Sequence, residues 1–301
     1  MERNSLEAAQ AIARPSRDAM LRRDISVHHF WGQNRELFQD AWAVWEQGGN
    51  VQALDASLYD PKLREAVEQA WADPTKETAV KNLWKEVFPG VFEAQFFDPA
   101  KLSILRDYMA KVADAGIPLR PPYGISLNRG GAMLDSRSEG YLAAPSFQDF
   151  YRNLMDSYMR PISRLLFPDV VGYDTQTFGF SIQWQADADT SLRAHTDASS
   201  VTLNINLNLP GEEFAGSGVR FFDRDTRQVG ELTFAPGTAL IHHGSVPHES
   251  MPITEVERSN FVLWLYGNQG QVPPHGAEPE QISPYDRWTS VSVESDGFAP
   301  F

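Results

Sequence analysis

The sequence contains no cysteine among its 301 residues. A disulfide framework, a zinc–thiolate site, an iron–sulfur cluster and a cysteine nucleophile are therefore excluded within this chain. Any metal ion must be held by histidines, of which there are 7, or by the 40 aspartates and glutamates.

Long apolar runs are also missing. No stretch reaches the roughly 18 consecutive apolar residues that a membrane span needs. The first 24 residues lack the apolar segment of a secretory signal and mix arginines with acidic residues, which is unlike a transit peptide. We therefore expect a cytoplasmic protein that does not enter a membrane.

Positive charge is scarce. The 26 lysines and arginines leave a net charge of −14, so nothing would offset repulsion from the phosphates of a nucleic acid. We expect no nucleic-acid partner. The hydrophobic content of 42% over 301 residues is enough for one sizeable core.

Helical signals dominate the first part of the chain. Asp60-Pro61, Asp73-Pro74 and Asp98-Pro99 each read as an N-cap followed by proline at the first helical position. Apolar residues recur at helical spacing after them, and the second helix is expected to extend to Phe88. These patterns predict a mostly helical region over residues 1–115, packed on the core.

The periodicity changes to two after Pro168. Strands are predicted at 178–185, 201–208, 218–222, 229–234, 238–242 and 260–267. The segment 201–208 alternates cleanly between apolar and polar residues. We therefore predict an α+β protein with a jelly-roll-like core, flanked by a helical layer.

The predicted core spans residues 116–270 and includes an amphipathic helix over 147–166 with a kink at Pro161. Residues 271–301, rich in proline and glutamate, are predicted to form a C-terminal tail on the surface.

A His-x-Asp pair, His195 and Asp197, precedes the alternating strand. Alternate residues of an extended segment point the same way, so both side chains can reach one ion. Iron(II) bound by two histidines and one carboxylate keeps three positions open. We favour His248, which follows a turn after a strand, as the third ligand. His242 and His243 compete with it, and His242 reads better as a structural hydrogen-bonding residue.

Arg258 lies ten residues after His248. A 2-oxo acid would chelate the metal through its keto oxygen and adjacent carboxylate, and its far carboxylate would need a cation. Arginine suits this because its planar fork binds a carboxylate bidentately and stays charged. Asn260 shares its face by alternation and would add a hydrogen bond. The alternative is a surface ion pair of Arg258 with Glu255 or Glu257.

These residues resemble the Fe(II)- and 2-oxoglutarate-dependent oxygenases, in their prolyl 4-hydroxylase and lysyl hydroxylase branch. The stretches DTSLRAHTDASSVTLNINLN, FAGSGVRFF and GTALIHHGSVPHES, with Arg258, are most similar to the lysyl hydroxylase catalytic domain over residues 178–267. The resemblance implies a double-stranded β-helix, with His195, Asp197 and His248 as iron ligands and Arg258 as the 2-oxoglutarate anchor.

The resemblance also implies an activity. Members of this family hydroxylate an unactivated C–H bond with O2, and they decarboxylate 2-oxoglutarate to succinate; ascorbate is an additional candidate cofactor. Halogenating relatives lack the carboxylate ligand, so the presence of Asp197 favours hydroxylation.

The sequence departs from the family at one cofactor position. Eleven residues before the first ligand histidine the family usually has a tyrosine that helps to hold 2-oxoglutarate, and here the residue is Trp184. Its indole N–H would donate in place of the tyrosine hydroxyl. The secretory signal and cysteines of the family are also missing, so collagen modification in a secretory compartment is not expected.

Two segments are predicted to rim the mouth of the site, a hairpin over 121–135 and a loop over 186–194. They carry polar residues that we predict to bind a small polar, amino-acid or peptide-like substrate, namely Tyr123, Asn128, Arg129 and Arg193. The alternative is that the arginines are solvated loop charges.

Two other functions stay open. One is a cupin-like metal enzyme that does not use 2-oxoglutarate. The other is a non-catalytic binding protein on the same fold.

Overall fold

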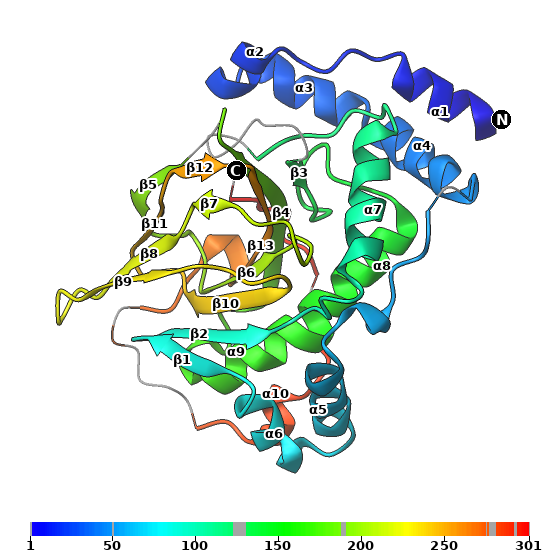
Figure 1. Cartoon of the computed structure of the whole chain (residues 1–301). Coiled ribbons are helices and arrows are strands. Elements are labelled where there is room, and N and C mark those ends of the chain that lie inside the picture. Colours follow the sequence, from blue (N-terminus) through cyan, green and yellow to red (C-terminus); the bar gives the residue numbers. More distant parts are fainter. Residues whose placement is uncertain are drawn as a thin grey trace.

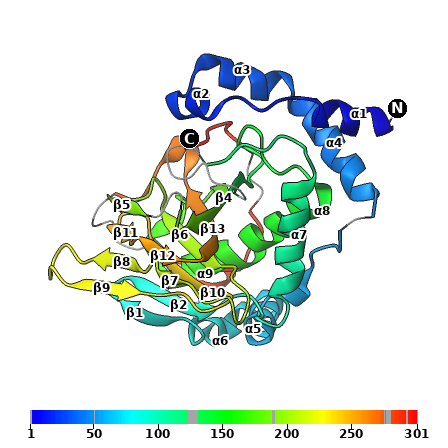
Figure 2. The same ribbon diagram turned by 45° about the horizontal axis from the view of Figure 1, so that its top comes forward.

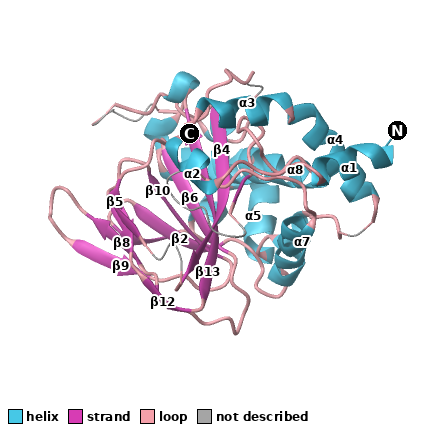
Figure 3. Cartoon of the chain, turned by 90° about the horizontal axis from the view of Figure 1, so that it is seen from above, coloured by secondary structure: helices cyan, strands magenta, loops and turns pink. Residues whose placement is uncertain are grey.

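The computed structural model describes residues 2–49, 51–122, 131–187, 191–274, 276, 281–291 and 294–300. The fold mixes helices with antiparallel sheets (Figure 1). Viewed from above, the helices gather on one side of the molecule and the strands on the other (Figure 3).

The helices before residue 116 are α1 (Glu2–Gln10), α2 (Arg17–Arg22), α3 (Ile25–Gln33), α4 (Arg35–Gln47), η1 (Ala56–Leu58), α5 (Pro61–Ala72), η2 (Pro74–Lys76), α6 (Thr78–Lys81) and α7 (Leu102–Asp114). Of these helices, α1 to α4 lie along the top of Figure 1, α7 lies at the right, and α5 and α6 lie at the bottom. The later ones are α8 (Pro145–Asn153), η3 (Leu154–Met159), α9 (Arg160–Leu166), η4 (Pro168–Val170), η5 (Asn268–Gly270) and α10 (Pro284–Arg287). Figure 2 shows α7 and α8 beside the strands and α1 to α4 as a band along one border.

The strands run from residue 85 to residue 266. They are β1 (Lys85–Phe88), β2 (Val91–Gln95), β3 (Ala132–Met133), β4 (Gln176–Gln185), β5 (Leu192–His195), β6 (Val201–Asn206), β7 (Ala215–Gly216), β8 (Val219–Phe222), β9 (Val229–Leu232), β10 (Thr238–His243), β11 (His248–Ser250), β12 (Ile253–Glu255) and β13 (Glu257–Tyr266).

The strands form two main sheets in which every pairing is antiparallel. The large sheet has the order β1-β2-β10-β6-β13-β4-β3, and the small sheet has the order β5-β11-β8-β9. A short pair, β12-β7, lies apart from both. The large sheet includes two strands that precede residue 116, so it crosses the boundary that the sequence predicted between the helical region and the core.

Both faces of the large sheet are covered. The apolar residues of β6 join the main core with the helices, and Phe147 of α8 meets Phe261 of β13 edge to face at 6.4 Å. On the opposite face, Leu240 of β10 packs with Val219 and Phe221 of the small sheet. The alternation predicted for 201–208 therefore holds. Its polar face, however, is buried between the sheets and not exposed to water.

The helix predicted over 147–166 is α8, η3 and α9 run together. The irregularity lies in η3, a π-helical turn over Leu154–Met159, and so just before Pro161. Proline lacks the N–H of the regular helical ladder and its ring crowds the preceding turn, which is a recognised cause of such a distortion.

The helix expected to extend to Phe88 is wrong. Helix α6 ends at Lys81, and Lys85–Phe88 pairs with Val91–Gln95 as a hairpin. Pro89 and Gly90 form the turn, and Gly90 has a φ of +70° that favours glycine. Pairing of β2 with β10 then holds this hairpin on the large sheet.

The tail is anchored to the helical region through α10. Glu77 accepts hydrogen bonds from Arg287 Nε at 2.8 Å and from Trp288 Nε1 at 3.0 Å. The Trp288 ring is buried and meets Trp71 edge to face at 5.7 Å. Among the described residues, no helix combines the length and apolar character that crossing a membrane requires.

Val256 lies in the turn between β12 and β13 and adopts a φ of +63°. Its side chain is 63% exposed. A β-branched residue is strained in this left-handed region, whereas asparagine tolerates it. We expect Val256→Asn to raise the free energy of unfolding by about 1 kcal/mol, measured by urea denaturation. Val229→Asn is the matched control, because Val229 is 57% exposed but lies in a regular strand. An equal gain from both substitutions would contradict the strain argument.

Candidate metal centre

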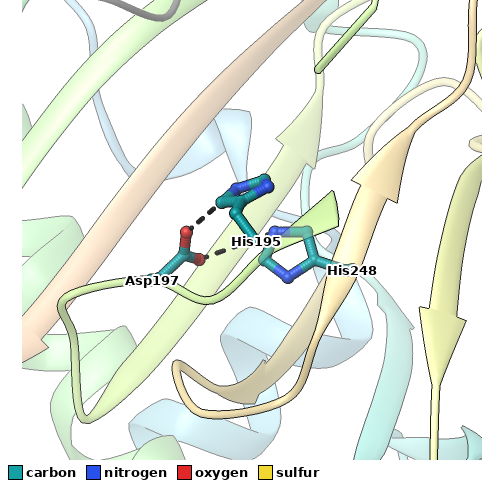
Figure 4. Close-up of side chains that lie close together, drawn as sticks. All are labelled: His195, Asp197 and His248. Carbon is teal, nitrogen blue, oxygen red and sulfur yellow. Dashed lines mark ion pairs between the residues drawn. The ribbon is translucent and has the colours of Figure 1, made fainter. Parts of the chain in front are cut away.

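Three side chains predicted as metal ligands converge at one point. The ligand atoms of His195, Asp197 and His248 all lie within 4.8 Å of one another. The Nε2 atom of His195 is 3.4 Å from Asp197 Oδ1, and that of His248 is 3.7 Å from Asp197 Oδ2 (Figure 4). Within the described residues, no other group of three such side chains is close enough to hold a metal ion.

The small sheet positions the two histidines. His195 ends β5 and His248 begins β11, and the antiparallel register places them directly opposite each other. Such a pair brings two residues that are distant along the chain onto one face of a sheet. Their rings lie 4.4 Å apart between centroids.

Asp197 reaches the same point from a loop. Strand β5 ends at His195, so Asp197 is the second residue of the loop that follows it. The Asp197 N–H donates to the carbonyl of Gly244 at 2.9 Å. A Cβ at Gly244 would come within 2.1 Å of the Ser199 carbonyl oxygen, so glycine is needed for this close approach.

Backbone carbonyls orient both imidazoles. The Nδ1 atom of His195 is 2.9 Å from the Arg193 carbonyl, and that of His248 is 3.0 Å from the Val246 carbonyl. Because a carbonyl only accepts, each Nδ1 carries a proton, so Nε2 is the ring atom that faces Asp197 and is available to a metal ion. Metal-binding histidines are commonly held in this way.

The electrostatics favour an ionised carboxylate. Burial opposes ionisation of Asp197, but hydrogen bonds from His195 and Thr202 and the nearby His248 and His242 lower its pKa to about 2. Burial lowers the pKa of His248. Burial acts the same way on His195, but the hydrogen bond and charge of Asp197 outweigh it and raise that pKa. A cation bound at Nε2 of His195 or His248 would displace a proton from that atom. Two imidazoles and one carboxylate fit the donor set of a facial iron site.

The competing histidines have other partners. His242 is buried behind His248, with ring centroids 4.9 Å apart, and its Nδ1 lies 2.8 Å from the His243 carbonyl. Burial lowers the pKa of His242 to about 4. His243 lies 3.4 Å from Asp169 through Nε2. The structure thus brings His248, and neither of its neighbours, to the pair of His195 and Asp197.

Arg258 lies in the same pocket as the three residues and is 1% exposed. Its Nη1 donates to the Ser217 carbonyl and its Nη2 is 3.4 Å from Ser250 Oγ. Its Nε is buried without a partner, and no carboxylate of the described residues pairs with it. Burial lowers its pKa to about 9. The predicted alternative of a surface ion pair is therefore wrong, because Arg258 is buried and forms no ion pair with Glu255, Glu257 or any other described residue.

The two other predicted cofactor residues flank Arg258. Trp184 is its cross-strand neighbour on β4 and turns its ring toward the guanidinium, with the centroid 5.8 Å from Cζ. This contact uses the ring face, and donation from the indole N–H to 2-oxoglutarate stays a prediction. Asn260 is fully buried and donates from Nδ2 to Asn204 Oδ1 at 2.7 Å, while its own Oδ1 lacks a partner.

Apolar walls connect the cluster of His195, Asp197 and His248 with Arg258 in one pocket. The pocket is lined by Phe180, Ile182, Trp184, Leu192, Val219, Val262 and Trp264, with Thr202, Asn204 and Ser250 between the three clustered residues and Arg258. A ligand here would be largely shielded from water, with a metal-binding face at one position and a cation at another.

Comparisons with known proteins bear on the family. No family model matches the chain. A solved structure of prolyl 4-hydroxylases from Phytophthora capsici aligns with a TM-score of 0.47 at 16% identity, covering 72% of this chain and 71% of that one. The sequence is 26% identical over 232 residues to the 2-oxoglutarate and iron-dependent oxygenase domain-containing protein ICU11 of Arabidopsis thaliana, covering 72% of this chain and 54% of that protein. It is 34% identical over 151 residues to the multifunctional procollagen lysine hydroxylase and glycosyltransferase LH3 of Rattus norvegicus. This match covers 45% of this chain and 20% of LH3.

The chain is a relative of the 2-oxoglutarate and iron-dependent oxygenases. The resemblance predicted from the sequence is thereby confirmed, including its lysyl hydroxylase side. The chain spans about half the length of the curated relatives it matches, 54% in the case of ICU11.

The structure describes only one of the four predicted substrate residues, Arg193. Tyr123, Asn128 and Arg129 lie outside the described residues, as does most of the expected hairpin. Arg193 was expected in a loop but belongs to β5, where its side chain is exposed and its carbonyl holds His195. Its role toward a substrate stays a prediction.

Sequence reasoning missed three residues of the pocket region. Thr202 bonds to Asp197, while Ser217 and Ser250 contact Arg258. Two of them carried a signal: Thr202 is on the polar face of an alternating strand, and Ser250 follows His248 by two positions. Ser217 acts through its backbone carbonyl, for which residue identity gives no clue.

Proposed function

We propose that this protein is an Fe(II)- and 2-oxoglutarate-dependent dioxygenase that hydroxylates an unactivated C–H bond. The observation that carries the proposal is Arg258, a buried cation for which the described residues supply no counter-charge, in the same pocket as a His-Asp-His cluster. An unpaired buried charge is costly, so a site that keeps one is suited to an anionic ligand. A small diacid that chelates a metal meets both requirements.

Each residue has a defined task in this proposal. His195, Asp197 and His248 hold the iron. Arg258 binds the far carboxylate of 2-oxoglutarate, with Ser250 Oγ beside its Nη2. When bound, iron(II) supplies the redox chemistry that couples decarboxylation of 2-oxoglutarate by O2 to hydroxylation.

The surrounding residues prepare the pocket. The ring of Trp184 faces the guanidinium and the apolar walls exclude water, which strengthens the attraction between Arg258 and a carboxylate. Asn260, which is buried, and Asn204, which is partly buried, form a hydrogen-bonded pair on neighbouring strands. Two facing antiparallel sheets with the cluster between them support the further proposal that the core is a double-stranded β-helix.

The substrate is proposed to be small and polar, an amino acid or a peptide-like molecule. The similarity to a procollagen lysine hydroxylase over 45% of this chain supports that class. Tyr123, Asn128, Arg129 and Arg193 are the residues that we propose to contact it. The cytoplasmic location expected from the sequence stays a prediction.

An anaerobic titration of the apo-protein with Fe(II) and then 2-oxoglutarate tests the proposal. We expect a visible charge-transfer band when the keto acid chelates the bound iron, and succinate when O2 is admitted with a substrate. Iron binding without the band would favour a cupin-like enzyme that does not use 2-oxoglutarate. Failure to bind iron would favour a non-catalytic binding protein.

A further inference from the structure

Thr202 holds one oxygen of the metal-binding carboxylate. Its side chain is buried on the pocket face of β6, and its Oγ1 donates to Asp197 Oδ2 at 2.6 Å. Ser199 Oγ lies 2.9 Å from the same Oγ1. A threonine hydroxyl has one proton and an ionised carboxylate only accepts, so Ser199 must donate to Thr202 and Thr202 to Asp197.

The two oxygens of Asp197 therefore differ. Each oxygen faces one of the two histidines, Oδ1 at 3.4 Å from His195 Nε2 and Oδ2 at 3.7 Å from His248 Nε2, but only Oδ2 also accepts a short hydrogen bond from a donor that is not itself a metal-ligand candidate. An engaged lone pair is less available to a cation, so the bond favours Oδ1 as the atom offered to the metal.

The strand that carries Thr202 keeps this donor in place. Strand β6 lies inside the large sheet, and Thr202 is paired with His242 on one side and Trp264 on the other. The side chain is 2% exposed and packed between the two sheets. Both the backbone and the hydroxyl are thus ordered before any ligand arrives.

We propose that Thr202 is a positioning residue that restricts Asp197 to one-oxygen coordination and so preserves the coordination positions that 2-oxoglutarate requires. The inference rests on the proposed function. A two-histidine, one-carboxylate site has three open positions, of which a chelating keto acid takes two and O2 takes the third. A carboxylate that bound through both oxygens would occupy one of them.

Thr202→Val tests this inference because it removes the hydroxyl at nearly constant volume. Iron(II) affinity and the affinity of the iron-loaded protein for 2-oxoglutarate are measured separately, under anaerobic conditions, with the charge-transfer band as the second signal. We expect iron binding to be retained, 2-oxoglutarate affinity to fall about 10–100-fold, which is the range for outer-sphere partners, and the band to shift. Thr202→Ser keeps a hydroxyl, so it should show the wild-type 2-oxoglutarate affinity and the wild-type band.

Two further variants sharpen the test. Ser199→Ala leaves the bond between Thr202 and Asp197 intact and should have a smaller effect than Thr202→Val. Thr254→Val, at an exposed position on β12, is the matched control and should behave as wild type. If Thr202→Val does not fold, Thr202→Ala removes the same hydroxyl with a smaller side chain.

The outcomes separate this inference from the proposed function. Wild-type protein without a 2-oxoglutarate band would overturn both. A normal band and affinity in Thr202→Val would overturn only the positioning role. A parallel loss of iron and 2-oxoglutarate affinity, not restored by serine, would also overturn it, because a general structural defect acts on both ligands.

Discussion

Replacing Arg258 with methionine is expected to abolish 2-oxoglutarate binding and, at the same time, to make the ligand-free protein more stable. The guanidinium is 1% exposed, its Nε has no partner, and burial lowers its pKa to about 9. Removing one partner of a buried charge pair costs about 2–5 kcal/mol of binding free energy, or about 30-fold and upward in Kd. Without ligand the same cation is uncompensated, so an apolar side chain of similar length should raise the free energy of unfolding by about 1 kcal/mol or more.

Calorimetric titration with 2-oxoglutarate measures the loss of binding. Thermal unfolding with and without 2-oxoglutarate measures the change in stability. Arg258→Lys keeps the charge but loses the planar fork, and should bind with intermediate affinity. Arg106→Met is the matched control. Arg106, on α7, is partly buried and forms an ion pair with Glu212 at 3.3 Å. The variant should lose some stability and keep 2-oxoglutarate affinity. Unchanged binding in Arg258→Met would refute the anchor assignment.

Asp197→Ala is expected to weaken Fe(II) binding by more than about 100-fold, since outer-sphere partners alone are worth about 10–100-fold. Asp197 is the only carboxylate of the clustered set and supplies its negative charge, with a pKa lowered to about 2. Asp197→Asn keeps the shape and removes the charge, and we expect it to weaken binding as well. Equilibrium dialysis with metal analysis measures the affinity.

Asp169→Ala provides the control for this experiment. Asp169 also lies beside a histidine, His243, at 3.4 Å, but it is not part of the cluster. We expect Fe(II) affinity to be retained in this variant. Equal losses in Asp169→Ala and Asp197→Ala would mean that the metal does not bind where the cluster predicts.

Much of the architecture could be predicted where the local pattern is long. Strand β6 and the final strand β13 carry six and ten residues, and their predicted positions agree with the structure to within a few residues. The alternation of β6 follows from its apolar face meeting the helices. The short strands β5 and β11, of four and three residues, were not predicted as strands, because so few residues carry no usable periodicity.

The segment Lys85–Phe88 shows why a local pattern can mislead. Its apolar residues fit a helical face, but pairing with β2, which is itself paired with β10, makes it a strand. Cross-strand pairing with the neighbouring strand β2, which β10 holds in the large sheet, thus overrides the local preference.

The sequence by itself determined the chemistry that is available. The lack of cysteine limits metal ligands to histidine and carboxylate, and the His-x-Asp pair, the later histidines and Arg258 could be recognised from residue type and spacing. The curated relatives bear out the resemblance to 2-oxoglutarate and iron-dependent oxygenases. Residue identity is local information, so these conclusions needed no fold.

Only the tertiary structure decided how these residues meet. The register of β5 against β11 places His248, and not His242 or His243, opposite His195. The packing of the two sheets buries Arg258 where no described residue offers a counter-charge, and it brings Thr202 to Asp197. The physical reason is that register and burial depend on strands distant along the chain, whose contacts are absent until the sheets assemble.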